Sequence, residues 1–487
     1  EITGVGQTAF ALGKDLSSMR PQPRFQPFLQ GTQTDRLFGN ALRRLGVEGD
    51  DRVATFMWNN QEHLEAYVAV PSMGAVLHTL NIRLFPEQIE FVAYEAEDRV
   101  VIADLSLAPI LAPVLPKMET VHTVVAVGAG DLEPFQRSGK NVVRYHDITA
   151  AESDQFDWPA IDEKSAAAMC YTSGTTGHPK GVVYGHRSTY LHSTAVCSGN
   201  GMGLSFSDKA FPIVPMFHAN AWGLPYAALM AGADILLPDR HMDAKTLVHM
   251  IETQRPTVAG AVPTIWNDVM NYLEREPGHD ISSLRLVACG GSAVPMSLMK
   301  TFEERHGVQI RQLWGMTETS PTATLAWPPP GTPTARSWEI RGTQGRPMCG
   351  VEARIVDDEG AALPHDGEAV GELEVRGPWI TGSYYRNTDE SKFQSGWLRT
   401  GDVGRIDPQG YITLTDRAKD VIKSGGEWIS SVELENHLIA HPAVREAAVV
   451  GVPDDRWQER PLAAVVLHEG AQVRPEELRE FLSDKVV

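Results

Sequence analysis

The chain has 487 residues, a length that predicts roughly two to four domains with a substantial core. Its composition, 42% hydrophobic and 22% charged, is typical of a folded globular protein rather than a disordered one. The formal net charge of −19 argues against a nucleic-acid partner, because neutralising a phosphate backbone requires clustered lysines and arginines.

The cysteines and the hydropathy pattern further restrict the class of protein. The cysteines show neither paired metal-ligand spacing nor a disulfide-dense pattern, so we expect reduced thiols and a cytoplasmic protein. They are Cys170, Cys197, Cys289 and Cys349. No window of ~20 apolar residues could span a bilayer and nothing resembles a signal peptide, so membrane contact would be peripheral. The first residue is Glu1 rather than Met, as expected of a chain that begins inside a longer protein.

The first predicted elements alternate between helices and short strands. Apolar residues at helical spacing predict a helix over residues 36–45, and residues 51–57 predict a buried strand. Further apolar runs predict strands at 100–103, 121–127, 233–237 and 284–288, with helices at 244–254 and 295–306. This alternation predicts an α/β protein with mostly parallel sheets covered by helices on both faces.

Residues 171–181 concentrate hydroxyls, glycines and one lysine in a short polar loop. Glycines let the backbone approach an anion closely, hydroxyls donate hydrogen bonds, and Lys180 supplies positive charge. It is not a Walker loop, because His178 and Pro179 separate Gly177 from the lysine. The pattern predicts a polyphosphate site; the alternative is an ordinary surface turn. The predicted contacts are Thr172, Ser173, Gly174, Thr175, Thr176, Gly177 and Lys180.

Closely spaced strands follow Gly342, at 352–357, 371–376 and 411–415, and predict a small β-rich subdomain over about 343–417. The prolines at 328–330 predict a loop. We place the domain boundary at 416–420, which gives a large domain 1–417 and a small domain 418–487. In the small domain we predict a helix from near Ser431 and strands at 446–451 and 462–467.

Five motifs follow one another in a fixed order. They are 171–181, Phe217-His218-Ala219-Asn220-Ala221-Trp222, Leu313-Trp314-Gly315-Met316-Thr317-Glu318, 396–402 and 416–420. Together they resemble the AMP-forming acyl-CoA synthetases of the adenylate-forming superfamily, which also holds luciferases and peptide-synthetase adenylation domains. The resemblance covers about 36–487. Residues 217–222 and 425–435 look most like the fatty-acyl-CoA ligase branch.

The resemblance implies a two-step reaction. A carboxylate attacks the α-phosphate of ATP to give acyl-adenylate and pyrophosphate, and the thiol of coenzyme A then displaces AMP. Lys180, the loop donors and Mg²⁺ would neutralise the polyphosphate. The implied small molecules are a fatty acid, ATP, Mg²⁺ and coenzyme A, and related enzymes often form homodimers.

The resemblance also assigns nucleotide contacts. Glu318 would hold Mg²⁺ and Thr317 would donate to the α-phosphate, unless both are ordinary turn residues. Asp402 would accept from the ribose hydroxyls, with a helix-cap or turn aspartate as the alternative, and Arg417 would add a cationic contact, unless it forms a surface ion pair. Trp314 would stack on the adenine, unless it is core. The remaining predicted nucleotide contacts are Gly290, Gly291, Ser292, Gly315 and Met316.

The implied acyl pocket is hydrophobic. His218 would orient the carboxylate and gate access, although a lone histidine in an apolar stretch is usually a core residue. The other predicted lining residues, any of which could be ordinary core, are Trp222, Val262, Trp266, Ala293 and Met316. They include no charge partner for an ammonium, which favours a hydrophobic tail over an amino acid. Leu313 departs from the usual glycine, so the width of the pocket is open.

The small domain resembles a mobile α+β lid. Lys419 would be its hinge, and Lys423, Gly425 and Trp428 would approach the reacting centre or the pantetheine after rotation, with a surface turn as the alternative over 423–427. The family's second catalytic lysine lies in a C-terminal motif that is absent before Val487, and Lys485 lacks that context. We therefore expect an incomplete lid and impaired adenylation by these 487 residues.

The leading hypothesis is an ATP- and Mg²⁺-dependent ligase joining a medium- or long-chain fatty acid to coenzyme A. The alternatives are a ligase for short thioether or aryl acids, a fatty-acyl-AMP ligase that delivers to a carrier protein, a luciferase-type oxidase, and a nucleotide-binding regulator without turnover. The presence of Lys180, Glu318 and Asp402 argues against the regulator.

Overall fold

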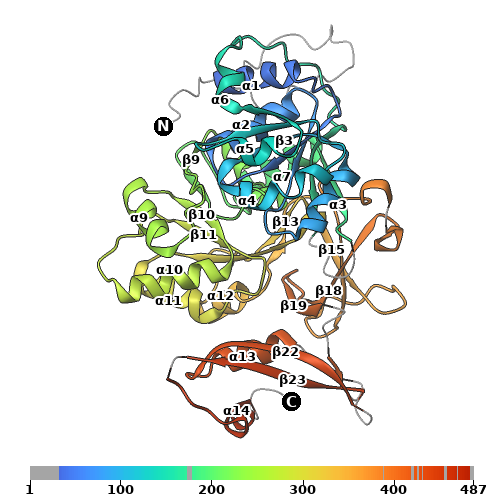
Figure 1. The fold of residues 1–487 in the computed structure, drawn as a ribbon. Coiled ribbons are helices and arrows are strands. Elements are labelled where there is room, and N and C mark those ends of the chain that lie inside the picture. The colour runs from blue at the N-terminus through green and yellow to red at the C-terminus, as the bar shows by residue number, and fades with distance from the viewer. Residues whose placement is uncertain are drawn as a thin grey trace, which may run out of the picture. The chain divides into compact units, whose positions relative to one another are not determined.

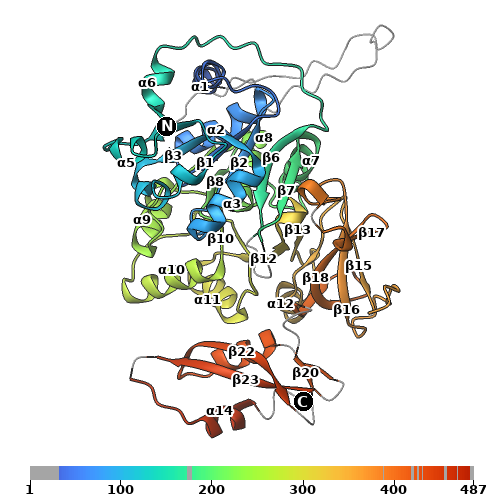
Figure 2. The ribbon, with the colours of Figure 1, turned by 45° about the vertical axis from the view of Figure 1, so that its right-hand side comes forward.

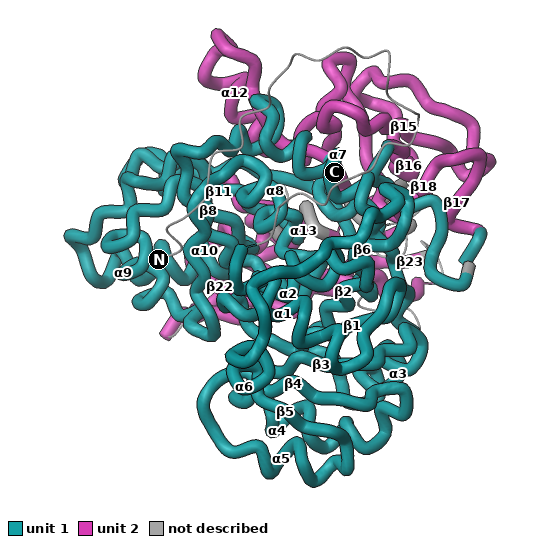
Figure 3. Tube along the Cα trace, turned by 90° about the horizontal axis from the view of Figure 1, so that it is seen from above, with its two compact units in different colours: residues 1–291, 298–323, 378–390 teal, residues 292–297, 324–377, 391–487 magenta. Residues whose placement is uncertain are grey.

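The computed structural model describes residues 32–482 except 173–177, 388, 418–421, 425–426, 430, 455–457 and 469 (Figure 1). The chain forms two compact units, coloured separately in Figure 3. Unit 1 comprises residues up to 291 together with 298–323 and 378–390, and unit 2 comprises 292–297, 324–377 and 391 onwards. This division does not follow the expected boundary at 417, which stays a prediction.

The first sheet of unit 1 has the strand order β5-β4-β3-β1-β2-β6-β7. Its neighbours are parallel apart from the antiparallel pair β6–β7. The strands are β1 (Arg52–Phe56), β2 (Val76–Thr79), β3 (Asp98–Asp104), β4 (Thr123–Val127), β5 (Asn141–Arg144), β6 (Ala166–Tyr171) and β7 (Gly181–Gly185). Strands β2 and β4 are buried along their whole length, as expected for a parallel sheet covered on both faces.

Short helices connect these strands (Figure 2). They are α1 (Gln33–Arg44), α2 (Gln61–Ser72), α3 (Pro86–Ala96), α4 (Ala108–Leu111), α5 (Glu133–Gln136) and α6 (Tyr145–Ala150), with the 3₁₀ turns η2 (Leu105–Leu107) and η3 (Leu115–Lys117). Helix α1 begins with a capping box in which Thr32 accepts from the Asp35 N–H and the Asp35 side chain accepts from the Thr32 N–H. The cap fixes the helix start just upstream of the predicted one.

Within unit 1 the strands of the second sheet follow the order β9-β8-β10-β11-β12-β13, and the pairs β9–β8, β8–β10, β10–β11 and β11–β12 are parallel. The strands are β8 (Lys209–Pro212), β9 (Asp234–Ile235), β10 (Val258–Ala261), β11 (Leu286–Cys289), β12 (Ile310–Gly315) and β13 (Thr322–Leu325). The helices are α7 (His186–Cys197), α8 (Leu224–Ala231), α9 (Ala244–Gln254), α10 (Pro263–Arg275) and α11 (Met296–His306). Both sheets confirm the predicted helix-covered, mostly parallel α/β architecture.

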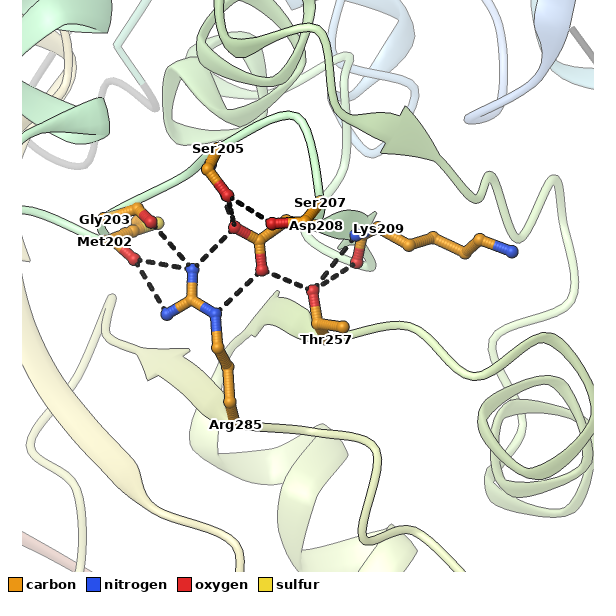
Figure 4. Close-up of polar contacts among 8 residues, drawn as sticks. All are labelled: Met202, Gly203, Ser205, Ser207, Asp208, Lys209, Thr257 and Arg285. Atoms are coloured by element: carbon orange, nitrogen blue, oxygen red, sulfur yellow. Dashed lines mark hydrogen bonds and ion pairs between the residues drawn. The ribbon is translucent and has the colours of Figure 1, made fainter. Parts of the chain in front are cut away.

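One hydrogen-bonded network ties the amino ends of β8, β10 and β11 together (Figure 4). Arg285, before β11, donates through Nε to Asp208 Oδ1 at 2.8 Å and through Nη2 to Oδ2 at 3.0 Å. Thr257, before β10, donates to Asp208 Oδ1 at 2.7 Å. Burial acts to raise the pKa of Asp208, but hydrogen bonds from Arg285 and Thr257 outweigh it and lower the pKa to about 2.

Unit 2 contains two antiparallel sheets. Its first sheet has the order β15-β16-β18-β17, with β19 paired to β18. Its strands are β15 (Glu352–Val356), β16 (Gly371–Arg376), β17 (Phe393–Gln394), β18 (Trp397–Ile406) and β19 (Ile412–Arg417). This part of the chain also contains α12 (Thr334–Arg341), the 3₁₀ turn η7 (Glu390–Lys392) and the short strand β14 (Arg346–Pro347), which is not part of this sheet. This sheet matches the predicted β-rich segment, and α12 is a helix that the sequence did not predict.

The second sheet of unit 2 has the order β21-β20-β23-β22 and carries two helices. The elements are β20 (Ile422–Ser424), β21 (Glu427–Ile429), α13 (Ser431–Ile439), β22 (Val444–Asp454), β23 (Gln458–Leu467) and α14 (Pro475–Leu482). Its buried core contains Ile422, Leu434, Leu438, Val444, Val449 and Leu478. The predicted α+β character of this segment is confirmed. Throughout the described part of both units, each helix is too short or too polar to cross a lipid bilayer.

Candidate active site

The ends of the polar loop are held together by the β6–β7 pair. The Thr172 N–H donates to the Lys180 carbonyl at 3.0 Å, and the Lys180 N–H donates to Thr172 Oγ1 at 3.1 Å. Both backbone groups of Lys180 are therefore fixed where β7 begins. The predicted contacts Ser173, Gly174, Thr175, Thr176 and Gly177 lie outside the described residues.

The side chain of Lys180 has two neighbours in unit 1. Its Nζ lies 2.5 Å from Asp389 Oδ2 and 5.1 Å from the ring centroid of Tyr384. The Lys180 and Asp389 side chains are 33% and 23% exposed, so the ion pair is only partly screened by water. The ammonium is thus held beside Asp389 and Tyr384.

Thr317 and Glu318 begin η5 (Thr317–Thr319), the turn that follows β12. The Tyr184 hydroxyl donates to the Thr317 carbonyl at 2.7 Å, and the Tyr384 hydroxyl donates to Glu318 Oε1 at 2.6 Å. The Thr381 N–H donates to the Glu318 carbonyl at 2.8 Å. Both the main chain and the side chain of Glu318 are therefore fixed, and Tyr384 links this carboxylate to Lys180.

The segment that contains His218 runs into a left-handed turn, η4 (Ala219–Gly223), in which Asn220, Ala221 and Trp222 have φ between 48° and 57°. Such backbone costs roughly 1–2 kcal/mol per residue for L-amino acids. Asn220 anchors the turn, because its Oδ1 accepts from Cys170 Sγ at 2.9 Å and from Thr79 Oγ1 at 3.2 Å. Strain of this kind is characteristic of ligand-binding segments.

Burial shifts the pKa values of two side chains in this region, those of His218 and Cys170. Burial, with a smaller contribution from the charge of Arg83, lowers the pKa of His218, so the imidazole is neutral at pH 7. Burial raises the pKa of Cys170 to about 11, so its thiol stays protonated and can donate to Asn220. A neutral imidazole can hydrogen-bond to a carboxylate without adding a full charge to the pocket.

Two glycines, Gly290 and Gly291, follow the carboxyl end of β11 and lie against residues of the neighbouring strands or just after them. A Cβ on Gly290 would lie 2.5 Å from Leu313 Cδ1, and one on Gly291, at φ +85°, would lie 3.3 Å from Val262 Cγ1. Predicted adenine and acyl residues therefore lie together here, at the edge of a parallel sheet where ligands bind in α/β proteins.

Two tryptophans with predicted substrate contacts, Trp314 and Trp266, are both buried. Trp314 in β12 is 8% exposed, and Trp266 in α10 is fully buried with its ring centroid 5.8 Å from that of Phe302 in α11. Gly315 and Met316 follow Trp314 directly and are half-buried. Contact of these residues with a substrate stays a prediction.

The other predicted residues belong to unit 2. Asp402 in β18 and Arg417 in β19 are direct cross-strand partners, and Lys423 in β20 is the partner of Trp428 in β21. The roles predicted for these four residues stay predictions. Ser292 and Ala293 lie in a short segment of unit 2, and Lys419 and Gly425 lie outside the described residues.

The residues that the structure describes contain no group of three or more His, Cys, Asp or Glu side chains able to hold a metal ion. Mg²⁺ bound with a nucleotide takes most of its ligands from phosphates and water, and one or two carboxylates suffice. The carboxylate of Glu318, which is buried and held by the Tyr384 hydroxyl, fits that requirement.

Sequence reasoning missed Tyr184, Tyr384 and Asp389. Asp389 is 209 positions from Lys180, and a carboxylate in a polar loop carries no signal for that contact. The one available signal was the pair of tyrosines at 384–385, which stands between the turn-forming residues Gly382-Ser383 and Asn387.

Comparisons with known proteins identify the family. Residues 32–385 match the family of AMP-binding enzymes, and residues 433–487 match the AMP-binding enzyme C-terminal domain. A 3-methylmercaptopropionyl-CoA ligase of Ruegeria lacuscaerulensis is 44% identical over 93% of this chain and 84% of its own. A long-chain-fatty-acid–CoA ligase of Thermus thermophilus is 44% identical over 92% of this chain and 81% of its own.

Among solved structures, the anthranilate CoA ligase AuaEII in complex with anthranoyl-AMP matches with a TM-score of 0.83. It is 28% identical, and the match covers 93% of this chain and 85% of the other. The named acids differ among these relatives, so they do not select a fatty-acyl branch. The chain belongs to the AMP-binding enzyme family and is an AMP-forming carboxylate–CoA ligase.

Proposed function

We propose that this enzyme activates a medium- or long-chain fatty acid with ATP and transfers the acyl group to coenzyme A. The observation that supports this acid class is that the predicted pocket residues of unit 1 are apolar apart from the neutral His218: Trp222, Val262, Trp266 and Met316. The side-chain oxygen of the adjoining turn η4, Asn220 Oδ1, is already engaged by Cys170 and Thr79. An amino-acid ammonium would need a buried acceptor, whereas an alkyl tail needs none.

In the proposed first step, a carboxylate oxygen attacks the α-phosphorus of ATP and pyrophosphate leaves. Lys180 would stabilise the charge that develops on the phosphate oxygens, and Thr317 would donate to the α-phosphate. Mg²⁺ held by Glu318 would neutralise polyphosphate charge. Neutral His218 would orient the carboxylate.

In the proposed second step, the sulfur of coenzyme A attacks the acyl carbon and the bond from that carbon to the bridging oxygen breaks. AMP leaves with that oxygen, and the thiol proton is lost to solvent. We infer that Lys423 and Trp428, cross-strand partners in unit 2, take part in this step. Asp402 and Arg417 would hold the nucleotide in both steps.

A second candidate substrate is a short thioether acid. Leu313, which replaces the usual glycine, lies against Gly290 and would shorten a pocket at that point. The Ruegeria relative, named for such an acid, is as similar in identity as the fatty-acid relative.

The test is kcat/KM for thioester formation across a series of straight-chain acids, with 3-methylmercaptopropionate compared with its isostere pentanoate. For a fatty-acid enzyme we expect kcat/KM to rise about fourfold per added CH₂ until the pocket is filled, because each buried CH₂ is worth about 0.8 kcal/mol. A preference for the thioether over pentanoate, with falling rates for longer acids, would select the second candidate. Nucleotide binding without thioester formation from any acid would reject both.

A further inference from the structure

Tyr384 contacts both side chains that we assign to the polyphosphate and its metal ion. Its hydroxyl donates to Glu318 Oε1 at 2.6 Å, and its ring centroid lies 5.1 Å from Lys180 Nζ. Tyr384 and Glu318 are each only 5% exposed. One rigid side chain therefore spans the distance between an ammonium and a carboxylate.

The chemistry of these contacts fixes the orientation of both groups. The Tyr384 hydroxyl donates to Glu318 Oε1, because an ionised carboxylate can only accept a hydrogen bond. A donor on Oε1 holds the carboxylate plane in one orientation, as hydrogen bonds to metal-binding carboxylates do. The face of the ring attracts the ammonium through its quadrupole, so Lys180 is drawn toward the same side chain.

Tyr384 is itself held from both sides. The Thr381 N–H donates to the Glu318 carbonyl at 2.8 Å, and Arg386 Nη2 donates to Glu97 Oε1 at 2.6 Å at the end of α3. A Cβ on Gly181, the residue after Lys180, would lie 3.0 Å from Tyr385 Cβ. Residues 381–386 thus connect the η5 turn, the start of β7 and α3 within unit 1.

We propose that Tyr384 is a positioning residue that sets the spacing between the Lys180 ammonium and the Glu318 carboxylate, and thereby where the polyphosphate and its Mg²⁺ bind. This inference rests on the proposed function for the assignment of those two groups. Tyr384 need not touch the reacting atoms, because it acts through the groups that do.

Tyr384→Phe is the decisive variant, because it keeps the ring beside Lys180 and removes only the hydroxyl. Outer-shell partners of metal ligands typically change metal affinity 10- to 100-fold when removed. We therefore expect the Mg²⁺ concentration for half-maximal ATP binding, measured by titration calorimetry on the full chain, to rise at least roughly tenfold. Tyr384→Leu, which also removes the ring, should in addition weaken ATP binding at saturating Mg²⁺.

The matched control is Tyr145→Phe. The Tyr145 hydroxyl donates to the Glu65 carboxylate, both side chains are buried, and the described contacts of Tyr145 lie among α1, α2 and α6. The control therefore removes the same kind of hydrogen bond and should lower thermal stability without changing the Mg²⁺ requirement.

An unchanged Mg²⁺ requirement in Tyr384→Phe would overturn the inference, and so would the same increase in Tyr145→Phe. The binding assay needs no turnover, so it separates this inference from the proposed function. Wild-type enzyme that binds ATP with Mg²⁺ but makes no adenylate from any acid contradicts the proposed function alone. Wild-type enzyme whose ATP binding does not depend on Mg²⁺ contradicts the inference.

Discussion

The ammonium of Lys180 has a charged neighbour that a bound polyphosphate would compete with. Asp389 Oδ2 lies 2.5 Å from Lys180 Nζ, and both side chains are partly exposed. If Lys180 contacts ATP, the phosphate must take over at least part of this interaction. Partly exposed ion pairs of this kind contribute roughly 0.2–1 kcal/mol, so the competition is modest.

We therefore expect the Asp389→Asn variant to bind ATP more tightly than the wild type. Removing the carboxylate frees Lys180 and removes one negative charge beside the phosphates, so KM for ATP should fall by roughly two- to fivefold. Asp389→Glu keeps the charge and serves as the control, with KM close to the wild-type value. Steady-state kinetics at saturating acid and coenzyme A measure both, and a higher KM in Asp389→Asn would show instead that Asp389 positions the lysine for binding.

At the same scale, sequence reasoning named Lys180, Thr317 and Glu318 but not the tyrosines that hold them. The first three stand in short motifs with characteristic neighbours, which one sequence can display. Tyr184 and Tyr384 act through contacts between segments distant in sequence, and their residue type alone suggests only a buried aromatic. Their roles require the fold.

Among the elements, the left-handed turn η4 depends on the glycine that ends it. Gly223 has φ +70°, and a Cβ there would lie 2.6 Å from Cε1 and Nδ1 of His192 in α7. Gly232, at the end of α8, has nearly the same φ of +69°, but its Cβ would have only Phe206 nearby, at 3.9 Å. The two glycines differ in crowding and hardly in backbone conformation.

Gly223→Ala and Gly232→Ala should therefore differ in their cost. The left-handed backbone alone predicts a loss of roughly 1–2 kcal/mol for Gly232→Ala. Gly223→Ala should lose clearly more and should also impair turnover, because the displaced turn carries Trp222. Urea unfolding measures the loss of stability and kcat measures the loss of turnover. Equal losses of stability in the two variants would mean that the His192 ring can move aside without a cost in free energy.

The network at the amino ends of β8, β10 and β11 allows a second comparison between elements. Asp208 is 7% exposed, whereas Asp280, which pairs with Arg255 at 2.5 Å in the same region, is 55% exposed. Asp208→Asn should destabilise unit 1 by roughly 1–3 kcal/mol, because it takes the charged acceptor away from the hydrogen bonds that Arg285 and Thr257 donate to a buried carboxylate. Asp280→Asn should cost little, because water screens its pair. Urea unfolding measures the loss of stability in each variant. Equal losses would contradict the claim that the buried ion pair of Asp208 stabilises the fold more than the exposed pair of Asp280.

Elements with a strong local period were predictable. The helix at 244–254 and the strand at 371–376 were expected with the bounds that the structure gives, because their hydrophobic periods are complete and turn residues flank them. Helix α12 was missed, because it follows a run of prolines that predicts only loop and has little periodic apolar character. Strands β22 and β23 are longer than predicted, since pairing with each other extends them beyond their apolar centres.

For the whole molecule, buried histidines make stability depend on pH. Burial lowers the pKa of His63 to about 4 and that of His192 to about 3, from 6.5 in an exposed histidine. Below pH 6.5 the unfolded chain therefore binds more protons than the folded one, so these groups lower stability as the pH falls toward their folded pKa values. Asp35, whose pKa burial raises to about 7, acts in the opposite direction.

Comparing wild type with His192→Asn isolates one of these groups. His192 Nε2 accepts from the Thr322 N–H at 3.2 Å, and an asparagine retains an acceptor oxygen. We expect the melting temperature of the wild type to fall further between pH 7.5 and pH 5.0 than that of the variant, since below pH 6.5 one buried neutral histidine lowers the stability by about 1.4 kcal/mol per pH unit. Equal falls would mean that His192 is not held neutral in the folded protein.

At the scale of the whole chain, the alternation of helices and apolar strands predicted the α/β architecture, and the order of motifs predicted the enzyme class. The grouping of the chain into two compact units did not follow from it. Residues 378–390 belong to unit 1 although strands of unit 2 flank them in sequence, because their contacts are with Glu318, Lys180 and Glu97. A domain boundary drawn from composition cannot show that a segment within one unit's sequence packs into the other unit.

The most direct test of the account follows the oxygen of the acid. A decanoate labelled with ¹⁸O in its carboxylate is converted in the presence of ATP, Mg²⁺ and coenzyme A, and the nucleotide and phosphate products are analysed by mass spectrometry. Adenylate formation predicts one ¹⁸O in AMP for each thioester formed and none in pyrophosphate. Label in inorganic phosphate together with ADP, or thioester formation without labelled AMP, would contradict it.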